Sequence, residues 1–270
     1  QNDKWELVFN QCQQQDPDII SFQEISLKFN NKIAFDKQEI HPLLEKYINT
    51  KNWYITSSRK SHCGHTINLI HKRLENDGFI IDVTDGIDTG NKWPAFILSK
   101  AESKDESANN ENDDENDDER KENDKSSSIV LPKLLFFGTH LYYGANNAHI
   151  RRRSIDRLYN VALQYKMQQY LVICGDTNMR DYEETKIVDS YDDISSCWDI
   201  VPEQFKSNSM FTWHKNYFQK GKPGVSRYDK LFYGSKVKCI SLGIFDVNCS
   251  NDKHHFLSDH RAVVAILEIQ

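Results

Sequence analysis

This sequence has no long hydrophobic run. Its longest apolar stretches, such as Leu171–Cys174 and Ala262–Leu267, have the length of strands, and none approaches the roughly 20 residues of a membrane-spanning helix. The absence excludes a protein that crosses a bilayer through helices. Hydrophobic residues nevertheless make up 38% of the 270 residues and aromatic residues 11%, which is enough for a packed core. We therefore expect a soluble globular protein.

Closely spaced cysteine pairs are also missing. The six cysteines are scattered along the chain, so the sequence does not predict the disulfide framework of a small secreted domain. Cys12 falls at helix-like spacing and Cys174 within an apolar run, positions typical of buried free thiols. The segment His62-Cys63-Gly64-His65 could supply part of a zinc site, but no second cluster completes four ligands. The cysteines indicate a reducing, intracellular setting.

The sequence also has no excess of basic residues, since its formal net charge is −6. The acidity is local, however. Between Ala101 and Ser128 lie twelve acidic and four basic residues, and the other 242 residues carry 30 basic against 28 acidic side chains. The charge therefore does not exclude a nucleic-acid ligand.

The acidic segment Glu102–Ser128 contains no large apolar residue. We expect it to be a disordered acidic insertion, because it cannot bury enough area to offset its ordering entropy. It separates two strand-like runs, Trp93–Leu98 and Leu134–Thr139, which indicates an insertion within a single domain of residues 1–270. A tolerated low-complexity insertion is the simpler interpretation, and a nucleic-acid mimic or partner-binding tail is the alternative.

Elsewhere the hydrophobic period changes repeatedly between about two and about 3.6 residues. Amphipathic helices are predicted at Trp5–Cys12 and Ile155–Tyr165, the second preceded by Arg151–Arg153. Strands are predicted at Ile19–Phe22, Ile67–Ile70, Phe79–Val83, Trp93–Leu98, Leu134–Phe137, Leu171–Cys174, Leu231–Tyr233 and Ala262–Ile269. Many strands separated by a few helices predict a layered α/β or α+β sandwich.

Polar residues follow four of the apolar runs, where loops leave a sheet and sites are commonly built. They are Gln23-Glu24, His140, Asp176-Thr177-Asn178 and Asp259-His260. One such residue alone would usually cap or solvate a turn. Together, these carboxylates, imidazoles and amides suit a hard metal ion and acid–base chemistry.

Four motifs resemble, in order and spacing, the endonuclease/exonuclease/phosphatase superfamily with its deoxyribonuclease I-like fold. They are Gln23-Glu24, Thr139-His140-Leu141, Gly175-Asp176-Thr177-Asn178 and Ser258-Asp259-His260. The resemblance covers nearly the whole chain apart from the acidic insertion. It implies an α+β fold, a two-layer β-sandwich flanked by helices, with the site at one edge.

Within the superfamily, Gly175–Asp181 is similar to the tyrosyl-DNA phosphodiesterase 2 branch, whose version is Gly-Asp-Thr-Asn-Leu-Arg-Asp. Phe211–Trp213 and Arg227–Phe232 resemble that branch's Thr-Trp and Arg-Phe-Asp-Arg segments. Two positions depart from the branch. Tyr142-Tyr143 stands where it has Glu-Ser, and His214 stands where it has Asp after the Trp. If the missing serine contacts phosphate, as the resemblance implies, another donor must replace it.

These residue types suit phosphodiester hydrolysis, which needs a cation, an in-line water and a group that takes its proton. Glu24 offers the hard oxygen ligand that Mg²⁺ prefers, with Mn²⁺ as a substitute metal. Asp176 is the candidate base, and Asn178 could orient the water or hold a phosphate oxygen, although a lone Gly-Asp-x-Asn is more often a turn. His140 and His260 are candidate donors to the charge of the transition state.

Two further carboxylates have alternative partners. Asp229 could accept a hydrogen bond from His260 and hold it cationic, or it could pair with Arg227 or Lys230. Asp259 could cap the last turn or lie beside the metal, and we favour the metal-proximal interpretation.

The candidate substrate contacts are basic or aromatic. Arg180 can bind a phosphate oxygen through two hydrogen bonds, and Arg227 is a second substrate-binding candidate. Trp213 offers a face for an unpaired base, although a Trp in a Phe-Thr-Trp run is ordinarily core. Arg151–Arg153 and Arg157 could bind the DNA backbone or simply begin a solvated helix.

The resemblance therefore implies a Mg²⁺-dependent phosphodiesterase that hydrolyses the 5′-phosphotyrosyl bond left by a trapped topoisomerase and leaves a 5′-phosphate. It implies as partner a single-stranded DNA end with a 5′-tyrosyl or peptide adduct, and as setting a monomer in the nucleus, with the cytoplasm as a second compartment. The alternatives are another superfamily hydrolase (a ribonuclease, an abasic endonuclease, or an inositol-phosphate or lipid phosphatase) and a catalytically silent binding module.

One element of the superfamily is missing from the sequence. The resemblance implies a strand with an Asn-containing motif before the first helix. Only four residues precede Trp5, too few for a central strand of about five or more residues and its turn. We therefore expect this chain to lack its first strand, as a fragment of a longer protein would.

Overall fold

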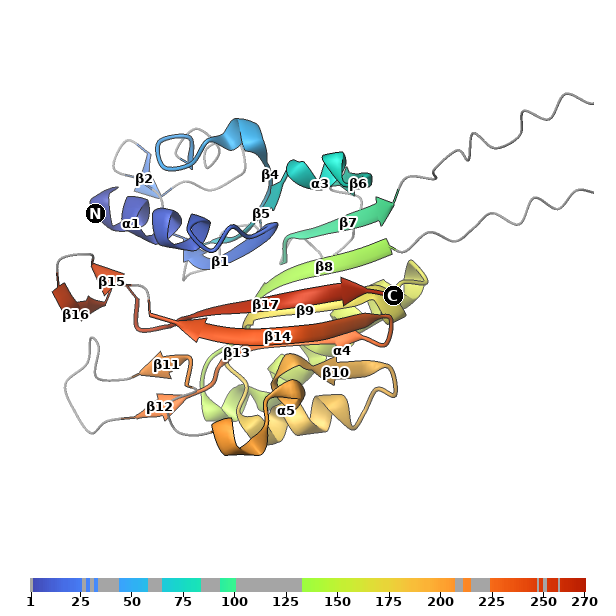
Figure 1. The fold of residues 1–270 in the computed structure, drawn as a ribbon. Coiled ribbons are helices and arrows are strands. Elements are labelled where there is room, and N and C mark those ends of the chain that lie inside the picture. Colours follow the sequence, from blue (N-terminus) through green and yellow to red (C-terminus); the bar gives the residue numbers. More distant parts are fainter. Residues whose placement is uncertain are drawn as a thin grey trace, which may run out of the picture.

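Two layers of strands, with helices on their outer sides, make up the protein (Figure 1). A computed structural model describes residues 2–25, 28–29, 32–33, 44–57, 65–83, 93–100, 133–206, 211–214, 224–246, 248–249, 252–256 and 258–270. No helix within these ranges is long and apolar enough to cross a bilayer.

One layer is a six-stranded sheet with the strand order β10-β13-β9-β8-β7-β6. Its strands, in chain order, are β6 (Phe79–Asp82), β7 (Ala95–Lys100), β8 (Lys133–His140), β9 (Leu171–Asp176), β10 (Ile194–Ser196) and β13 (Asp229–Gly234). β8 and β9 run parallel, whereas the other neighbours pair antiparallel. The apolar runs of the sequence predict all of these strands except the short β10.

The second layer contains the strands β1 (Ile19–Ile25), β5 (His65–His71) and β4 (Trp53–Ser57), in the order β1-β5-β4, and the antiparallel pair β14 (Val237–Phe245) and β17 (Ala262–Ile269). Among the described residues, β1 and β17 each pair with a neighbour on one side only. Buried side chains from both layers form one core cluster, which includes Ile70, Phe96, Phe136, Val172 and Val237.

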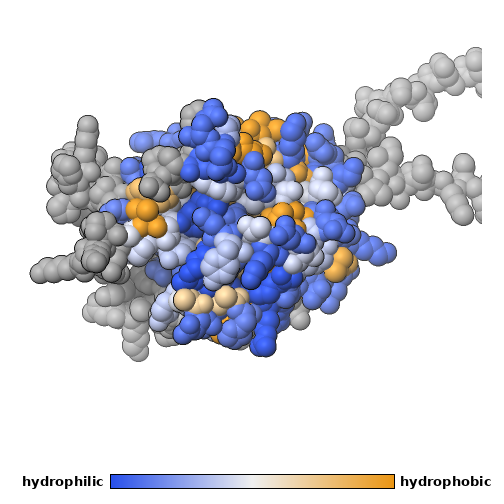
Figure 2. Space-filling view, turned by 90° about the horizontal axis from the view of Figure 1, so that it is seen from below, coloured by the Kyte–Doolittle hydropathy of each residue, from blue (hydrophilic) through white to orange (hydrophobic). Residues whose placement is uncertain are grey.

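Helices pack on both outer faces of the sandwich. α1 (Asn2–Gln13) packs on the second layer, where buried Phe9 meets the edge of the Phe22 ring at 4.8 Å between centroids. α4 (Ala148–Gln164) and α5 (Asp181–Val188) pack on the six-stranded sheet through a cluster that includes Leu158 and Ile187. The surface on the α4 and α5 side is mostly hydrophilic, with small separate hydrophobic areas (Figure 2). The predicted α+β sandwich flanked by helices is thus confirmed.

Short elements connect this framework. They are the helix α3 (Arg73–Asn76), the 3₁₀ helices η1 (Thr50–Asn52), η2 (Ala145–Asn147), η3 (Gln168–Tyr170), η4 (Cys197–Ile200) and η5 (Glu203–Phe205), and the strands β2 (Lys28–Phe29), β3 (Lys32–Ile33), β11 (Trp213–His214), β12 (Val225–Ser226), β15 (Asn248–Cys249) and β16 (Asp252–Phe256).

The arginine run differs from its prediction, because α4 begins before it and includes it. Arg151 is fully buried and pairs with Glu183 of α5, with Nη2 2.8 Å from Oε1. Arg152 binds Asp156 on the helix surface instead. A backbone contact with DNA is therefore wrong for Arg151, since its guanidinium is enclosed.

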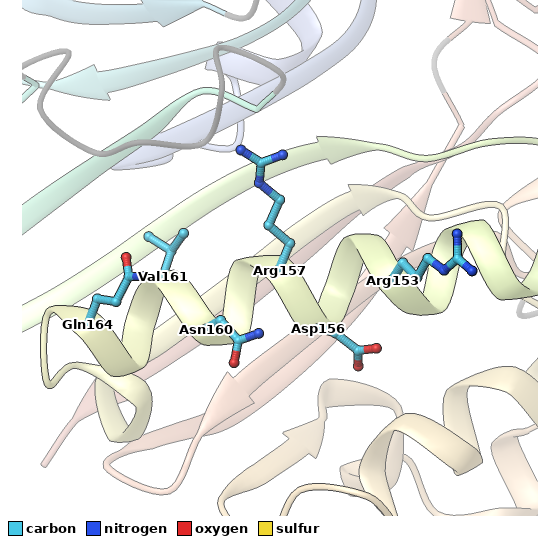
Figure 3. Close-up of a pocket in the computed structure, with 6 residues that line it drawn as sticks. All are labelled: Arg153, Asp156, Arg157, Asn160, Val161 and Gln164. Atoms are coloured by element: carbon cyan, nitrogen blue, oxygen red, sulfur yellow. The ribbon is translucent and has the colours of Figure 1, made fainter.

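The remaining two arginines of that prediction lie along a surface hollow on α4. The hollow has a volume of about 310 Å³. Figure 3 draws the side chains that line it, which are Arg153, Asp156, Arg157, Asn160, Val161 and Gln164. All six belong to one helix, and none is a predicted catalytic residue. DNA contacts by Arg153 and Arg157 stay a prediction.

The acidic insertion 102–128 lies outside the described residues. The strands on either side of it, β7 and β8, are antiparallel neighbours, with Ser99 opposite Lys133. The segment therefore joins two adjacent strand ends of one sheet. Its disorder stays a prediction, as does the loss of a first strand.

Candidate active site

Three predicted site residues meet at one end of the six-stranded sheet. The parallel register of β8 and β9 sets His140 opposite Asp176, and the antiparallel register of β13 and β9 sets Asp229 opposite Asp176. His140 Nε2 lies 3.7 Å from Asp176 Oδ2. Strand pairing alone therefore brings together residues that are up to 89 positions apart in the sequence.

The residue before Asp176 must be glycine. Gly175 has φ of +129°, and a Cβ there would lie 2.2 Å from the carbonyl oxygen of Thr139. Any larger residue would push β9 away from β8. Gly175 thus permits the close strand approach on which the His140–Asp176 distance depends.

Glu24 reaches the same point from the second layer. The pairing of β1 with β5 is irregular between Phe22 and Ile25, and Glu24 there has φ of +56°, a left-handed conformation that is uncommon for a glutamate. Its Oε1 lies 3.4 Å from His140 Nε2, and its side chain is 58% exposed. The irregularity in β1 therefore presents a solvent-accessible carboxylate at the edge of the site.

His260 is oriented by a second carboxylate. Its Nδ1 lies 2.8 Å from Asp229 Oδ2 and its Nε2 lies 3.8 Å from Asp176 Oδ2. Arg227 and Lys230, the alternative partners of Asp229, instead bind Glu184 and Asp181 of α5. Of the two arrangements that the sequence left open, the structure contains the Asp229–His260 pair.

The ionisation of the site follows from this packing. Burial and the charge of Asp229 raise the pKa of Asp176 to about 7. Burial lowers the pKa of His260, but the charge and hydrogen bond of Asp229 together with the charge of Asp176 outweigh it and raise that pKa to about 10. Near pH 8, Asp176 can therefore accept a proton while His260 stays cationic.

Asn178 holds Asp176 in place. Its backbone N–H donates to Asp176 Oδ1 at 2.8 Å, and its Nδ2 donates to Asp176 Oδ2 at 3.1 Å and to the Leu141 carbonyl at 3.0 Å. Asn178 has φ of +52°, which asparagine tolerates better than most residues. In this structure Asn178 therefore orients the carboxylate within a turn, which the sequence offered as the alternative interpretation of Gly-Asp-x-Asn. Its contact with water or phosphate stays a prediction.

The donor set suits a hard cation. Asp176, Asp229 and His260 offer ligand atoms within 4.8 Å of one another. However, Asp229 and His260 are already hydrogen-bonded to each other. The exposed Glu24 carboxylate is a better match for Mg²⁺, which keeps several waters and takes one or two protein carboxylates. Glu24, with Asp176 nearby, is the group of residues that fits this metal.

Asp259 and Trp213 form a pair of their own. The indole N–H of Trp213 donates to Asp259 Oδ2 at 3.1 Å, and its ring lies 5.6 Å from that of Tyr228. The backbones of Trp213 and His260 also form an isolated antiparallel β-bridge. In this structure Asp259 therefore orients the Trp213 indole, and its place beside a metal stays a prediction.

The two predicted substrate arginines differ in exposure. The Arg180 side chain is 32% exposed and its Nη1 lies 3.3 Å from Glu183 Oε1. Arg227 is only 9% exposed, is bound to Glu184 at 2.6 Å and stacks on Trp198 at 3.8 Å. Arg180 is thus partly exposed at the start of α5, four residues after Asp176, whereas Arg227, two residues before β13, is held against α5.

Replacing Asp229 with asparagine should lower the pKa of His260 by about 1 to 3, because an adjacent opposite charge shifts a pKa by that amount. NMR titration of the imidazole ring measures this value without an activity assay. Asp193→Asn, which changes a carboxylate bound to Tyr159, is the matched control. An unchanged His260 pKa in Asp229→Asn would refute the pairing.

Comparisons with known proteins concern the fold of this chain. No family model matches the chain, and no curated protein matches its sequence. Solved structures do: an endonuclease/exonuclease/phosphatase from Bacteroides vulgatus is 13% identical, with 98% of this chain and 90% of that chain covered and a TM-score of 0.58. The fold is thus that of the endonuclease/exonuclease/phosphatase proteins, the deoxyribonuclease I-like fold.

Structures of TDP2 show the same fold. Truncated TDP2 from Caenorhabditis elegans is 18% identical, with 100% of this chain and 91% of that chain covered and a TM-score of 0.61. TDP2 from D. rerio, complexed with a single-strand DNA product, is 15% identical over 97% of this chain and 92% of that chain, with a TM-score of 0.60. At these identities the likeness shows the shared fold.

Proposed function

We propose that this protein is a Mg²⁺-dependent phosphodiesterase that hydrolyses 5′-phosphotyrosyl bonds at single-stranded DNA ends and leaves a 5′-phosphate. The observation that carries the proposal is the meeting of Glu24, His140, Asp176 and His260 at one sheet edge. The likeness of Gly175–Asp181 to the TDP2 motif and the fold shared with TDP2 structures support the substrate class. A monomer in the nucleus, and also in the cytoplasm, is part of the same proposal.

Each residue of the site has a separate role in the proposed hydrolysis. Asp176, oriented by Asn178, takes the proton of the attacking water. His260, kept cationic by Asp229, and His140 donate hydrogen bonds to the phosphate oxygens as charge develops on them. A Mg²⁺ held by Glu24 would supply further positive charge to the phosphate.

The leaving group explains why a tyrosyl end would be preferred. A phenol has a pKa near 10, far below that of a sugar alcohol, so its oxygen leaves with little help from an acid. The site has one evident base in Asp176, whereas its imidazoles face the phosphate charge. An enzyme of this design would cleave tyrosyl ends faster than ordinary DNA linkages.

A substrate panel tests the proposal. We expect Mg²⁺-dependent release of tyrosine from a 5′-tyrosyl oligonucleotide at a rate at least about tenfold above cleavage of the unmodified oligonucleotide. A phosphoinositide and a ribonucleotide oligomer complete the panel. Faster hydrolysis of either of these, or of the unmodified strand, would overturn the tyrosyl assignment, and inactivity on all four would favour a binding module.

Replacing Glu24 with glutamine should abolish most activity because it weakens the binding of Mg²⁺, and excess Mg²⁺ should restore part of the activity. Steady-state rates across a Mg²⁺ titration measure both effects. Glu268→Gln is the matched control, because Glu268 is a half-exposed carboxylate on β17 whose nearest ion-pair partner is Lys238. A Glu24→Gln enzyme with normal rates and normal metal dependence would contradict the role of Glu24.

A further inference from the structure

Two exposed tyrosines follow directly after the strand that carries His140. The residues Tyr142 and Tyr143 are 52% and 67% exposed. They stand where the tyrosyl-DNA phosphodiesterase 2 branch has Glu-Ser. The proposed mechanism gives these two tyrosines no role. Two solvent-facing aromatic side chains therefore lie two and three residues after His140, the last residue of β8.

The backbone under these rings is firmly held. The buried guanidinium of Arg151 donates from Nη1 to the carbonyl of Tyr142 at 2.7 Å and to that of Gly144 at 2.8 Å. Asn147 Nδ2 donates to the carbonyl of Tyr143 at 2.6 Å. The rings therefore project from a fixed support, which lowers the entropy that a bound partner must remove.

The same support connects the tyrosines to both the catalytic strand and a cation. The backbone N–H of Leu141, next to Tyr142, donates to the carbonyl of Asp176 at 2.9 Å. Glu183 Oε1, which binds Arg151 at 2.8 Å, also lies 3.3 Å from the half-exposed Arg180. The backbone that carries the two tyrosines is thus connected both to the backbone of Asp176 and, through Arg151 and Glu183, to the surface guanidinium of Arg180.

This combination fits a nucleotide. A flat base can stack on a tyrosine ring, and a phosphate can bind the guanidinium. We propose that Tyr142 and Tyr143 form a stacking surface for an unpaired base of the strand whose phosphodiester is hydrolysed at Asp176. The inference rests on the proposed function and adds the residues that select a single-stranded nucleic-acid end.

Binding without turnover tests the stacking directly. An oligonucleotide with 2-aminopurine near its 5′ end should lose fluorescence when it binds the wild-type protein in EDTA, because stacking quenches this base. The double variant Tyr142→Ala/Tyr143→Ala should abolish the quenching and weaken binding about tenfold or more. Tyr142→Phe/Tyr143→Phe keeps the rings and should restore both, and Tyr165→Ala, an exposed tyrosine after α4, should change neither.

Kinetics then separate this inference from the proposed function. On a 5′-tyrosyl oligonucleotide the alanine double variant should raise KM about tenfold with kcat little changed, and it should have no effect on a substrate whose terminal nucleotides are abasic. Unchanged quenching and KM in this variant would overturn the stacking surface even if tyrosine is released. An equal loss on the abasic substrate would also overturn it, since the rings would then contact the tyrosyl side. Base-dependent quenching by a protein inactive on tyrosyl ends would refute the function and leave the surface standing.

Discussion

Asp176→Asn should lower kcat by about 10² to 10⁴, the usual contribution of a general base. Asparagine has nearly the same shape and keeps one of the two oxygens that accept hydrogen bonds from Asn178, while the group that takes the proton is lost. Steady-state hydrolysis of a 5′-tyrosyl oligonucleotide measures the effect. Asp77→Asn, an exposed carboxylate on the turn after α3, should keep the wild-type rate.

The same variant should not lose stability. In the folded protein the pKa of Asp176 is raised to about 7 from an ordinary value of 3.8. Ionisation of Asp176 therefore destabilises the fold increasingly between these two pH values, and fully above the higher one. At pH 8 the neutral asparagine removes this penalty, which exceeds the cost of about 1 kcal/mol for one lost hydrogen bond from Asn178, so the Tm should equal or exceed that of the wild type. A lower Tm together with the lost activity would mean that the substitution damages the fold instead of the chemistry.

Arg151→Met should destabilise the protein by about 3 to 5 kcal/mol, the usual cost of breaking a buried ion pair. The Glu183 carboxylate would stay buried without its main partner, and the carbonyls of Tyr142 and Gly144 would lose their donor. Burial raises the pKa of Glu183, but the hydrogen bonds and charge of Arg151, with smaller contributions from hydrogen bonds of Arg180, hold that pKa below its ordinary value. Urea unfolding at pH 7 measures the difference in free energy.

The neighbouring residue supplies the control. Arg152 binds Asp156 one turn along α4, and both side chains are 39% exposed, so Arg152→Met should cost about 1 kcal/mol or less. Equal losses of unfolding free energy in the two variants would show that the buried ion pair contributes no more to stability than the exposed one. Arg151→Met should also raise KM for the oligonucleotide, because the loop that carries Tyr142 and Tyr143 would lose its anchor.

The contrast between Arg151 and Arg152 shows what the sequence could not supply. Successive helix residues point about 100° apart, so a run of arginines has no single environment, and the partner that buries Arg151 lies 32 residues away. The strand ends were predictable because each apolar run directly precedes its polar residue. Which strand ends lie next to each other depends on the order and register of the strands, which the sequence does not show. For this reason the sequence could not decide whether Asp229 pairs with His260 or with Arg227 or Lys230.

Some elements were missed because their local signal is weak. β4 has the sequence Trp-Tyr-Ile-Thr-Ser, with few aliphatic residues, and β14 mixes Lys238 and Ser241 among its apolar residues. In α5 the acidic residues Glu183 and Glu184 face inward, opposite to the usual helical pattern. Their burial becomes favourable only through Arg151, Arg227 and Lys230, which belong to other elements.

The direction of β8 bears on how this protein can be engineered. The strand begins at Lys133, five residues after the acidic segment 102–128, and ends at His140 in the site. Its two ends are therefore roughly 23 Å apart at about 3.3 Å per residue. Because β7 and β8 are already neighbours in the sheet, a folded reporter whose own termini are close together could replace residues 102–128 at the end remote from Asp176. Such a chimera would carry a fluorescent or affinity module without a fusion at either end of the sequence.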